Sequence, residues 1–191
     1  MGLDMYLEKC DRRAWGYKDM DIDKMKAESP LLYNELKPLI VERGQYYHWE
    51  SFFAEVGYWR KANAIHRWFV ENVQNDVDDC GRYEVSKEQL ESLLETCNKV
   101  VENCKLVNGQ INNGYTFDEN GNKVSILADG QYIEDSGVAE ELLPTTGGFF
   151  FGSTDYDEYY LDDIKHTVDV VKKVLETTDF NREIISYTSS W

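Results

Sequence analysis

The strongest helical signal in the chain covers residues 51–74. At about 100° per residue, the apolar side chains of this stretch fill about half of a helical wheel, more than the stripe of an ordinary surface helix. The arc consists of Phe52, Val56, Tyr58, Trp59, Ala62, Ile65, Phe69, Val70 and Val73. An arc of this width indicates contacts on more than one side, so we expect a broad central helix at about 51–75.

Segments near both ends of the chain are predicted to be strands. Leu3, Met5 and Leu7 alternate with Asp4, Tyr6 and Glu8, a period of two that predicts a half-buried strand. Residues 183–187 are the last predicted strand, and we expect it to pair with the first. Residues 19–41 are charged and contain two prolines, which predicts one or two short helices broken at those positions.

The second half of the chain carries helix and turn signals. Ser86 and Gln89 form a capping box, which predicts a helix beginning at that point. Three Asn-Gly pairs within residues 108–123 predict a β-hairpin that leaves the core at about 108–135. The Gly-Phe-Phe-Phe-Gly run at 148–152 predicts a short strand, and Asp162 or Asp163 is expected to begin the last helix.

Together these elements indicate an α+β fold: a single domain of residues 1–191, mainly helical around the central helix, with a small antiparallel sheet. A chain of 191 residues is long enough for one well-filled core and short for two domains. No apolar run approaches the roughly 20 residues of a membrane span, and the N-terminus lacks a signal-peptide pattern. We therefore expect a cytoplasmic protein.

Charge constrains the partners. The chain has 36 Asp and Glu against 20 Lys and Arg, a formal net charge of −16. Such a charge repels nucleic acids and membrane surfaces and attracts basic partners. The alternative is that the acidity only keeps the protein soluble.

Much of this charge lies in residues 124–164, the acid tract, which contains ten Asp and Glu residues and no Lys, Arg or His. Within it, Asp155, Tyr156, Asp157, Glu158 and Tyr159 interleave carboxylates with tyrosines. Clustered carboxylates can occupy a groove meant for phosphates, and tyrosine is favoured at interfaces. We expect these five residues to be exposed and to bind a partner. The alternative is that the acids begin a helix, where the helix dipole favours them.

A second candidate site lies on the expected central helix. Asn63 and His66 fall inside its apolar arc, and Arg60 lies at the edge. A buried amide or imidazole must be hydrogen-bonded, so both are expected to be buried and to share polar partners. They form either a structural network or the floor of a pocket, with Trp59 as a stacking surface and Arg60 and His66 as anion or amide contacts.

Motifs for catalysis or cofactor binding are weak. The four cysteines include no Cys-x-x-Cys pair, and zinc sites favour closely spaced ligand pairs. Gly152-Ser-Thr lacks the Gly-Lys of a phosphate-binding loop, and no Ser/His/Asp signature is present. We expect no metal and no cofactor, and the motifs favour binding over enzymatic activity.

Three strings resemble a family of small acidic proteins from phages and prophages of Gram-positive and gut bacteria. They are Met-Gly-Leu-Asp-Met-Tyr-Leu at 1–7, Gly-Tyr-Trp-Arg-Lys-Ala-Asn-Ala-Ile-His-Arg-Trp-Phe-Val at 57–70, and Gly-Gly-Phe-Phe-Phe-Gly-Ser-Thr-Asp-Tyr-Asp-Glu-Tyr-Tyr at 147–160. The resemblance covers about half of the chain and supplies no assigned active site. It implies a counter-defence role in the host cell, including anti-CRISPR activity.

The leading hypothesis is therefore an anti-CRISPR-type inhibitor whose acidic surface binds a basic host nuclease, with a Cas9-type effector as the best guess. No direct binding to nucleic acids or membranes is expected. The alternative is a protein that binds a small molecule or nucleotide in a pocket formed by Trp59, Arg60, Asn63 and His66.

Overall fold

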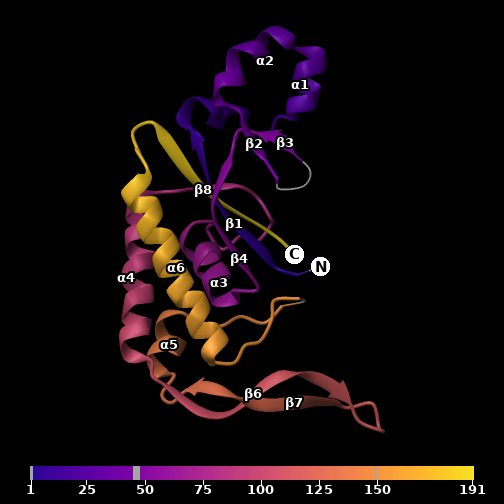
Figure 1. The fold of residues 1–191 in the computed structure, drawn as a ribbon, viewed down its shortest axis with the longest axis vertical. Helices are drawn as coiled ribbons and strands as arrows, with labels where there is room; N and C mark the ends of the chain where they lie inside the picture. Colours follow the sequence, from indigo (N-terminus) through magenta and orange to yellow (C-terminus); the bar gives the residue numbers. More distant parts are fainter. Residues whose placement is uncertain (1, 45–47, 149) are drawn as a thin grey trace.

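A computed structural model describes residues 2–44, 48–148 and 150–191. Its centre is a four-stranded antiparallel sheet with the strand order β4-β1-β8-β5, and Figure 1 shows a small lobe at one end and a long hairpin at the other. The strands are β1 (Asp4–Asp11), β2 (Val41–Arg43), β3 (Trp49–Ser51), β4 (Ala54–Arg60), β5 (Tyr83–Val85), β6 (Leu106–Phe117), β7 (Lys123–Ile133) and β8 (Glu183–Ser190). The helices are η1 (Arg12–Tyr17), α1 (Ile22–Glu28), α2 (Pro30–Leu36), η2 (Lys37–Leu39), α3 (Asn63–Asn72), α4 (Lys87–Asn103), α5 (Gly137–Leu142) and α6 (Glu158–Thr177).

The two middle strands of the sheet come from opposite ends of the sequence. β1 and β8 pair in antiparallel register from Asp4↔Ser190 to Asp11↔Glu183, which confirms the predicted pairing of the first and last strands. Side chains on one face of both strands, among them Met5, Leu7 and Tyr187, are fully buried. The strands therefore form the floor of the main core.

Three helices cover that face: α3, α4 and α6, with α4 and α6 side by side in Figure 1. The capping box predicted at Ser86 and Gln89 is present and begins α4. α6 passes so close to β4 that a Cβ on Gly57 would lie 2.5 Å from Val170 Cγ1. Glycine at this position permits the close packing of strand and helix.

The broad helix expected at about 51–75 is wrong in its first half. Residues 51–62 contain the end of β3, the whole of β4 and the turn into α3, and only Asn63–Asn72 is helical. On β4, Gly57 and Trp59 are buried on the core side, while Tyr58 and Arg60 are exposed. Pairing with β1 prevails over the helical periodicity, and Lys61 separates strand from helix with a φ of 63°.

The N-terminal lobe has its own small core. α1 and α2 are the two short helices predicted for residues 19–41, and Pro30 lies in the first turn of α2, where its missing N–H costs nothing. Arg43 of β2 ties the lobe to the sheet by contacting the buried carboxylate of Glu8. Arg82, just before β5, contacts the same carboxylate and lies over the Phe53 ring of the lobe. The lobe core consists of Cys10, Ala14, Ile22, Met25, Leu36, Phe52, Phe53 and Ile184.

The predicted hairpin excursion is confirmed. β6 and β7 form a two-stranded sheet and turn at residues 118–122, where Asp118 accepts hydrogen bonds from the backbone of Asn120 and Asn122. The hairpin extends away from the body of the molecule (Figure 1). Residues 115–127, at its outer end, are all exposed.

Two predictions for residues 148–164 need correction. The described residues of 148–152 form no strand, because each lies in an irregular segment that crosses the start of α3; Phe149 lies outside the described residues. The last helix begins at Glu158, four residues before Asp162, because Asp157 caps its N-terminus by accepting a hydrogen bond from the backbone N–H of Tyr160 at 3.0 Å.

The chain is therefore a single α+β domain, as predicted, but the strands form three sheets alongside the helices, and the expected mainly helical composition is not confirmed. Within the part of the chain that the structure describes, no helix has both the length and the apolar character to span a membrane.

Candidate functional site

Asn63 holds an irregular segment over the start of α3. We call residues 143–157, between α5 and α6, the strap. The Asn63 amide donates to the carbonyl oxygens of Phe151 at 3.1 Å and Ser153 at 2.7 Å, and it accepts from the backbone N–H of Thr146 at 3.0 Å. All three partners belong to the strap. One buried side chain therefore satisfies three backbone groups that no regular element pairs.

His66, one turn further along α3, joins the helix to the sheet and to the loop at residues 73–82. Its Nδ1 lies 2.7 Å from the Tyr187 hydroxyl and its Nε2 lies 3.0 Å from Asp78 Oδ2. Burial raises the pKa of Tyr187 well above its ordinary value, so the phenol stays protonated and donates to Nδ1. The Nε2–H then donates to the Asp78 carboxylate. Both ring nitrogens therefore have hydrogen-bond partners within the protein.

Asn63 and His66 are buried, as predicted, with 4% and 1% of their surfaces exposed. Lys61 is exposed, also as predicted. The expectation that the two buried residues share polar partners is wrong, because Asn63 bonds only to the strap and His66 bonds to Tyr187 and Asp78. Their spacing places them on successive turns of α3, and their side chains face different neighbours.

The four residues expected to form one pocket are not brought together. Trp59 lies on β4, is 2% exposed, and donates from Nε1 to the Thr167 hydroxyl at 2.9 Å, so its ring is core and not a stacking surface. The other three residues line two different cavities, one on each side of the strap. Arg60 and Asn63 line a cavity of about 410 Å³ on one side of it. His66 lines another cavity of about 440 Å³ on the other side.

The first cavity also contains an unusual carboxyl group. Burial, followed by the nearby Asp162 and Asp157 carboxylates, raises the pKa of Asp163 to about 7. Arg60 and Lys61 lie on the opposite wall. The described residues provide no ion pair for Asp163, so it is a carboxyl whose charge changes near neutral pH.

The five residues expected to bind a partner differ in exposure. Asp155 and Tyr159 are exposed and Tyr156 and Glu158 are half-buried. The prediction that Asp157 is exposed is wrong: it is 3% exposed and caps α6. Burial raises the pKa of Asp157, an effect that the N–H of Tyr160 opposes. The alternative explanation, that the acids begin a helix, therefore holds for Asp157. Its neighbours Asp155 and Tyr159 are exposed.

Most of the other acids in the tract are on the surface and unpaired. Only Glu158 and Asp163 are half-buried, and seven of the ten carboxylates are exposed: Asp129, Glu134, Asp135, Glu140, Glu141, Asp155 and Asp162. Among the described residues, the single ion pair from this tract joins Asp162 to Lys165 at 3.6 Å. The negative charge is therefore not neutralised within the molecule.

The base of the hairpin is joined to the acid tract. The Ile133 N–H donates to the Tyr156 carbonyl at 2.9 Å, and Tyr132 forms an isolated β-bridge with Asp157. The outer half of the hairpin then exposes three large apolar side chains on one face: Tyr115 is 50%, Leu127 60% and Phe117 72% exposed. Exposed apolar groups in such a cluster mark interaction sites. The sequence predicted the hairpin but not this exposed face. The signal available was the presence of Tyr115, Phe117 and Leu127 in the two strands.

Backbone strain gathers around α3. Among the described residues, the non-glycine residues with positive φ are Lys61, Asn75, Asp76, Cys80 and Phe150. Lys61 precedes α3, the next three lie in the loop that follows it, and Phe150 lies in the strap. Conformations of this kind cost about 1–3 kcal/mol each and persist at sites that the surrounding structure fixes, often functional ones.

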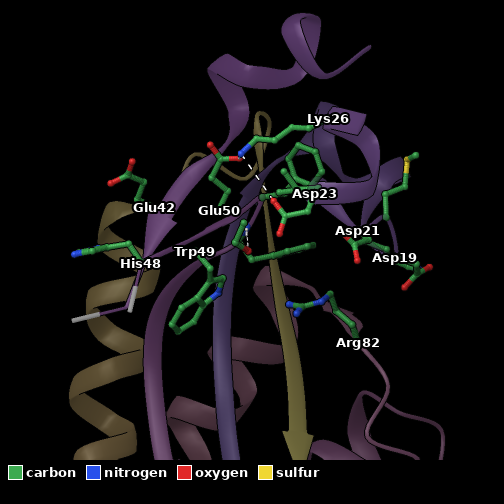
Figure 2. Close-up of a pocket in the computed structure, with 15 residues that line it drawn as sticks. Asp19, Asp21, Asp23, Lys26, Glu42, His48, Trp49, Glu50 and Arg82 are labelled. Atoms are coloured by element: carbon green, nitrogen blue, oxygen red, sulfur yellow. Dashed lines mark hydrogen bonds and ion pairs between the residues drawn. The ribbon is translucent and has the colours of Figure 1, made fainter. Parts of the chain in front are cut away.

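A larger cavity of about 730 Å³ lies between the N-terminal lobe and β3. In Figure 2, Trp49 and Arg82 lie on opposite sides of its lower part, below Lys26 and Glu50. Its charges are largely paired: Lys26 contacts Glu50 at 2.6 Å, and Arg82 contacts Glu8. This cavity was not predicted from the sequence, because its walls come from segments far apart in the chain.

Among the described residues, no three His, Cys, Asp or Glu side chains are grouped closely enough to hold a metal ion. Comparison with known proteins finds no matching family model, no similar curated protein and no similar solved structure. The chemistry of the candidate sites must therefore be inferred from their own side chains.

Proposed function

We propose that this chain is a protein-binding inhibitor that attaches to a basic protein through its hairpin and the adjoining acid tract. A single observation carries the proposal: the hairpin exposes Tyr115, Phe117 and Leu127 along its outer half, and its base is joined to a tract of mostly exposed carboxylates. We call these three side chains, with Asp155, Glu158, Tyr159 and Asp162, the hairpin–acid surface.

The two parts of this surface have complementary roles. Exposed aromatic and aliphatic side chains supply the contacts that hold a complex together, and tyrosine and phenylalanine are enriched in interface cores. The carboxylates attract a basic partner and speed up association. A protein of net charge −16 does not approach DNA or RNA itself, but it fits a surface that has evolved to hold phosphates.

The partner that fits this chemistry is a nuclease with a basic nucleic-acid channel. The resemblance of the chain to phage proteins supports a nuclease of a bacterial defence system, with a Cas9-type effector as the first to test. In such an effector the guide–target duplex lies in a positively charged channel, and an acidic protein bound there would exclude DNA.

The test is a DNA-cleavage assay with purified guide-loaded Cas9-type nuclease, together with a direct binding measurement at several salt concentrations. We expect binding that inhibits cleavage and weakens as salt rises. The triple variant Tyr115→Thr/Phe117→Thr/Leu127→Thr should lose at least about tenfold in affinity, because it removes the apolar anchors.

Leu31→Thr provides the matched control, because Leu31 is 86% exposed on the N-terminal lobe, far from the hairpin; its affinity should equal that of the wild type. Unchanged affinity in the triple variant would exclude the hairpin as the binding element. Absence of binding to basic nucleases of several defence systems would exclude the proposed class of partner.

A further inference from the structure

The cavity between α3, the strap and the loop at residues 73–82 has the composition of a ligand site and is independent of the hairpin–acid surface. We call it the α3 cavity. Its volume of about 440 Å³ lies within the range of small-molecule sites, which are mostly apolar with a few placed polar groups. Its walls include Val70, Phe151 and Trp191 as apolar groups and Arg67, Glu71 and Asp78 as charged ones.

Asp78 forms a fixed acceptor on one wall. Its Oδ2 accepts a hydrogen bond from His66 Nε2 at 3.0 Å and its Oδ1 accepts one from Trp191 Nε1 at 3.1 Å. A carboxylate has about four acceptor positions, so each oxygen can accept one further bond. The Asp78 side chain is 29% exposed. It can therefore accept a pair of N–H groups from a molecule in the cavity.

Trp191 provides an aromatic wall. The ring is 51% exposed, and it packs edge-on against Phe151 with 6.0 Å between centroids and 67° between planes. Its N–H bond to Asp78 fixes the ring orientation. The exposed indole offers a surface on which a planar ring in the cavity can stack, and stacking is favourable for every nucleobase. The stacking role expected of Trp59 thus falls to Trp191.

The strap leaves room for such a ring. A Cβ on Gly148 would lie 2.6 Å from the Phe151 ring, whereas a Cβ on Gly147 would meet nothing within 4 Å. The absence of a side chain at Gly148 allows Phe151 to pack, and its absence at Gly147 keeps that wall of the cavity open. At the rim, Arg67 is 40% exposed and uses Nε to contact Glu71 at 2.6 Å. Its guanidinium has further donors for an anionic group.

The backbone around the cavity is held in strained conformations. Asp76 and Cys80, on either side of Asp78, have φ values of 62° and 57°, and Phe150 beside Phe151 has a φ of 72°. Strain at the residues that position an acceptor and a ring indicates a preformed site.

We propose that the α3 cavity binds a nucleobase as part of a free nucleotide. The N–H edge of the base pairs with Asp78, its ring stacks on Trp191, and the attached phosphate lies at Arg67. Guanine fits best, because it offers two adjacent N–H donors to one carboxylate. His66 acts as a positioning residue that orients Asp78.

The test is titration calorimetry of the full chain with guanosine, guanosine monophosphate, adenosine, cytidine and inorganic phosphate. Guanosine should bind, the monophosphate several times more tightly, and phosphate alone weakly. Trp191→Ala should lose at least about tenfold in affinity for both guanine ligands, as expected for a lost stacking contact. Arg67→Ala should bind the monophosphate only as well as guanosine.

Trp49→Ala is the matched control, since Trp49 is 54% exposed on β3, and its affinities should equal those of the wild type. Asp78→Asn should lose guanosine binding, and its circular dichroism shows whether it is folded; Trp191→Ala and Arg67→Ala change exposed side chains and test the site independently. A short single-stranded oligonucleotide should bind more weakly than the mononucleotide. No saturable binding of any nucleoside at millimolar concentration, or full affinity in Trp191→Ala, would overturn the proposal.

Discussion

The polar side chains at the start of α3 and those of the hairpin–acid surface are satisfied in opposite ways. Each nitrogen and oxygen of the Asn63 and His66 side chains has a hydrogen-bond partner within the protein. Asp155 and Tyr159 are exposed instead, as is the Phe117 ring. The difference teaches that a polar residue within an apolar pattern indicates a buried network, whereas apolar residues on a projecting hairpin indicate a surface for another molecule.

Asn63→Ala should produce the largest loss of stability. The substitution removes three hydrogen bonds and leaves two carbonyl groups and one N–H of the strap without partners. We expect the free energy of unfolding to fall by about 2–4 kcal/mol, measured by chemical denaturation.

Asn103→Ala is the control for that measurement, because Asn103 is an exposed residue of α4 that bonds only to Lys99 in its own helix. If both variants lose equally little stability, the strap does not depend on Asn63, and the contrast between the two regions is wrong.

Asp163→Asn should stabilise the protein at high pH only. The carboxyl pKa is about 7 in the folded chain against an ordinary 3.8. As the pH rises, Asp163 therefore loses its proton at a lower pH in the unfolded chain than in the folded chain. The wild type therefore loses stability as the pH rises from about 4 to about 7. The amide has no charge to bury, and at pH 8 the variant should be more stable by about 1–3 kcal/mol, a range reduced for the partial exposure of Asp163.

Melting temperatures of both proteins at pH 4.5 and 8 measure this effect, which should be near zero at the lower pH. Asp162→Asn, a change in an exposed neighbour, should show no comparable difference. Equal curves for Asp163→Asn and the wild type would mean that Asp163 is well solvated.

Asp157→Ala distinguishes the structural acid from its exposed neighbours. The loss of an N-cap costs about 0.5–2 kcal/mol, so we expect a lower free energy of unfolding and fraying of the first turn of α6. The combined change Asp155→Asn/Glu158→Gln/Asp162→Asn should alter stability by less than about 1 kcal/mol. Denaturation of both variants under the same conditions gives the comparison; the reverse order would assign the exposed acids to the fold.

The smallest effect on stability belongs to the hairpin. Tyr115→Thr/Phe117→Thr/Leu127→Thr keeps the strand propensity, because threonine is β-branched, and should change the free energy of unfolding by less than about 1 kcal/mol. Its cost should appear in partner binding. Calorimetry of the free protein checks this, and a large drop in melting temperature would show that the hairpin face packs internally.

Local signals predicted several elements well. The Asn120-Gly121 pair marked the turn of the hairpin, whereas Asn108-Gly109 and Asn113-Gly114 lie within β6. The Ser86–Gln89 capping box located the start of α4, because such motifs act within a few residues. The pairing of the first and last strands was also predicted and is present.

Tertiary pairing explains the main error. Val56, Tyr58 and Trp59 fit a helical arc and also a strand, and only the register against β1 decides between them. Lys61 divides the two elements in a backbone conformation that lysine rarely adopts. No sequence rule marks such a residue. The site was affected in the same way, since moving Trp59 to a strand takes its ring away from His66.

The position of β8 between β1 and β5 also determines the order in which the chain can fold. β1 ends at Asp11 and β8 begins at Glu183, so the two middle strands meet only after residues 12–182 have been synthesised. Until then β1 has β4 alone, and one edge of a strand carrying Leu3, Met5 and Leu7 stays open to other strands. Pairing across such a separation folds slowly. The nascent chain therefore passes through a stage in which it is prone to aggregate, and its net negative charge opposes self-association during that interval.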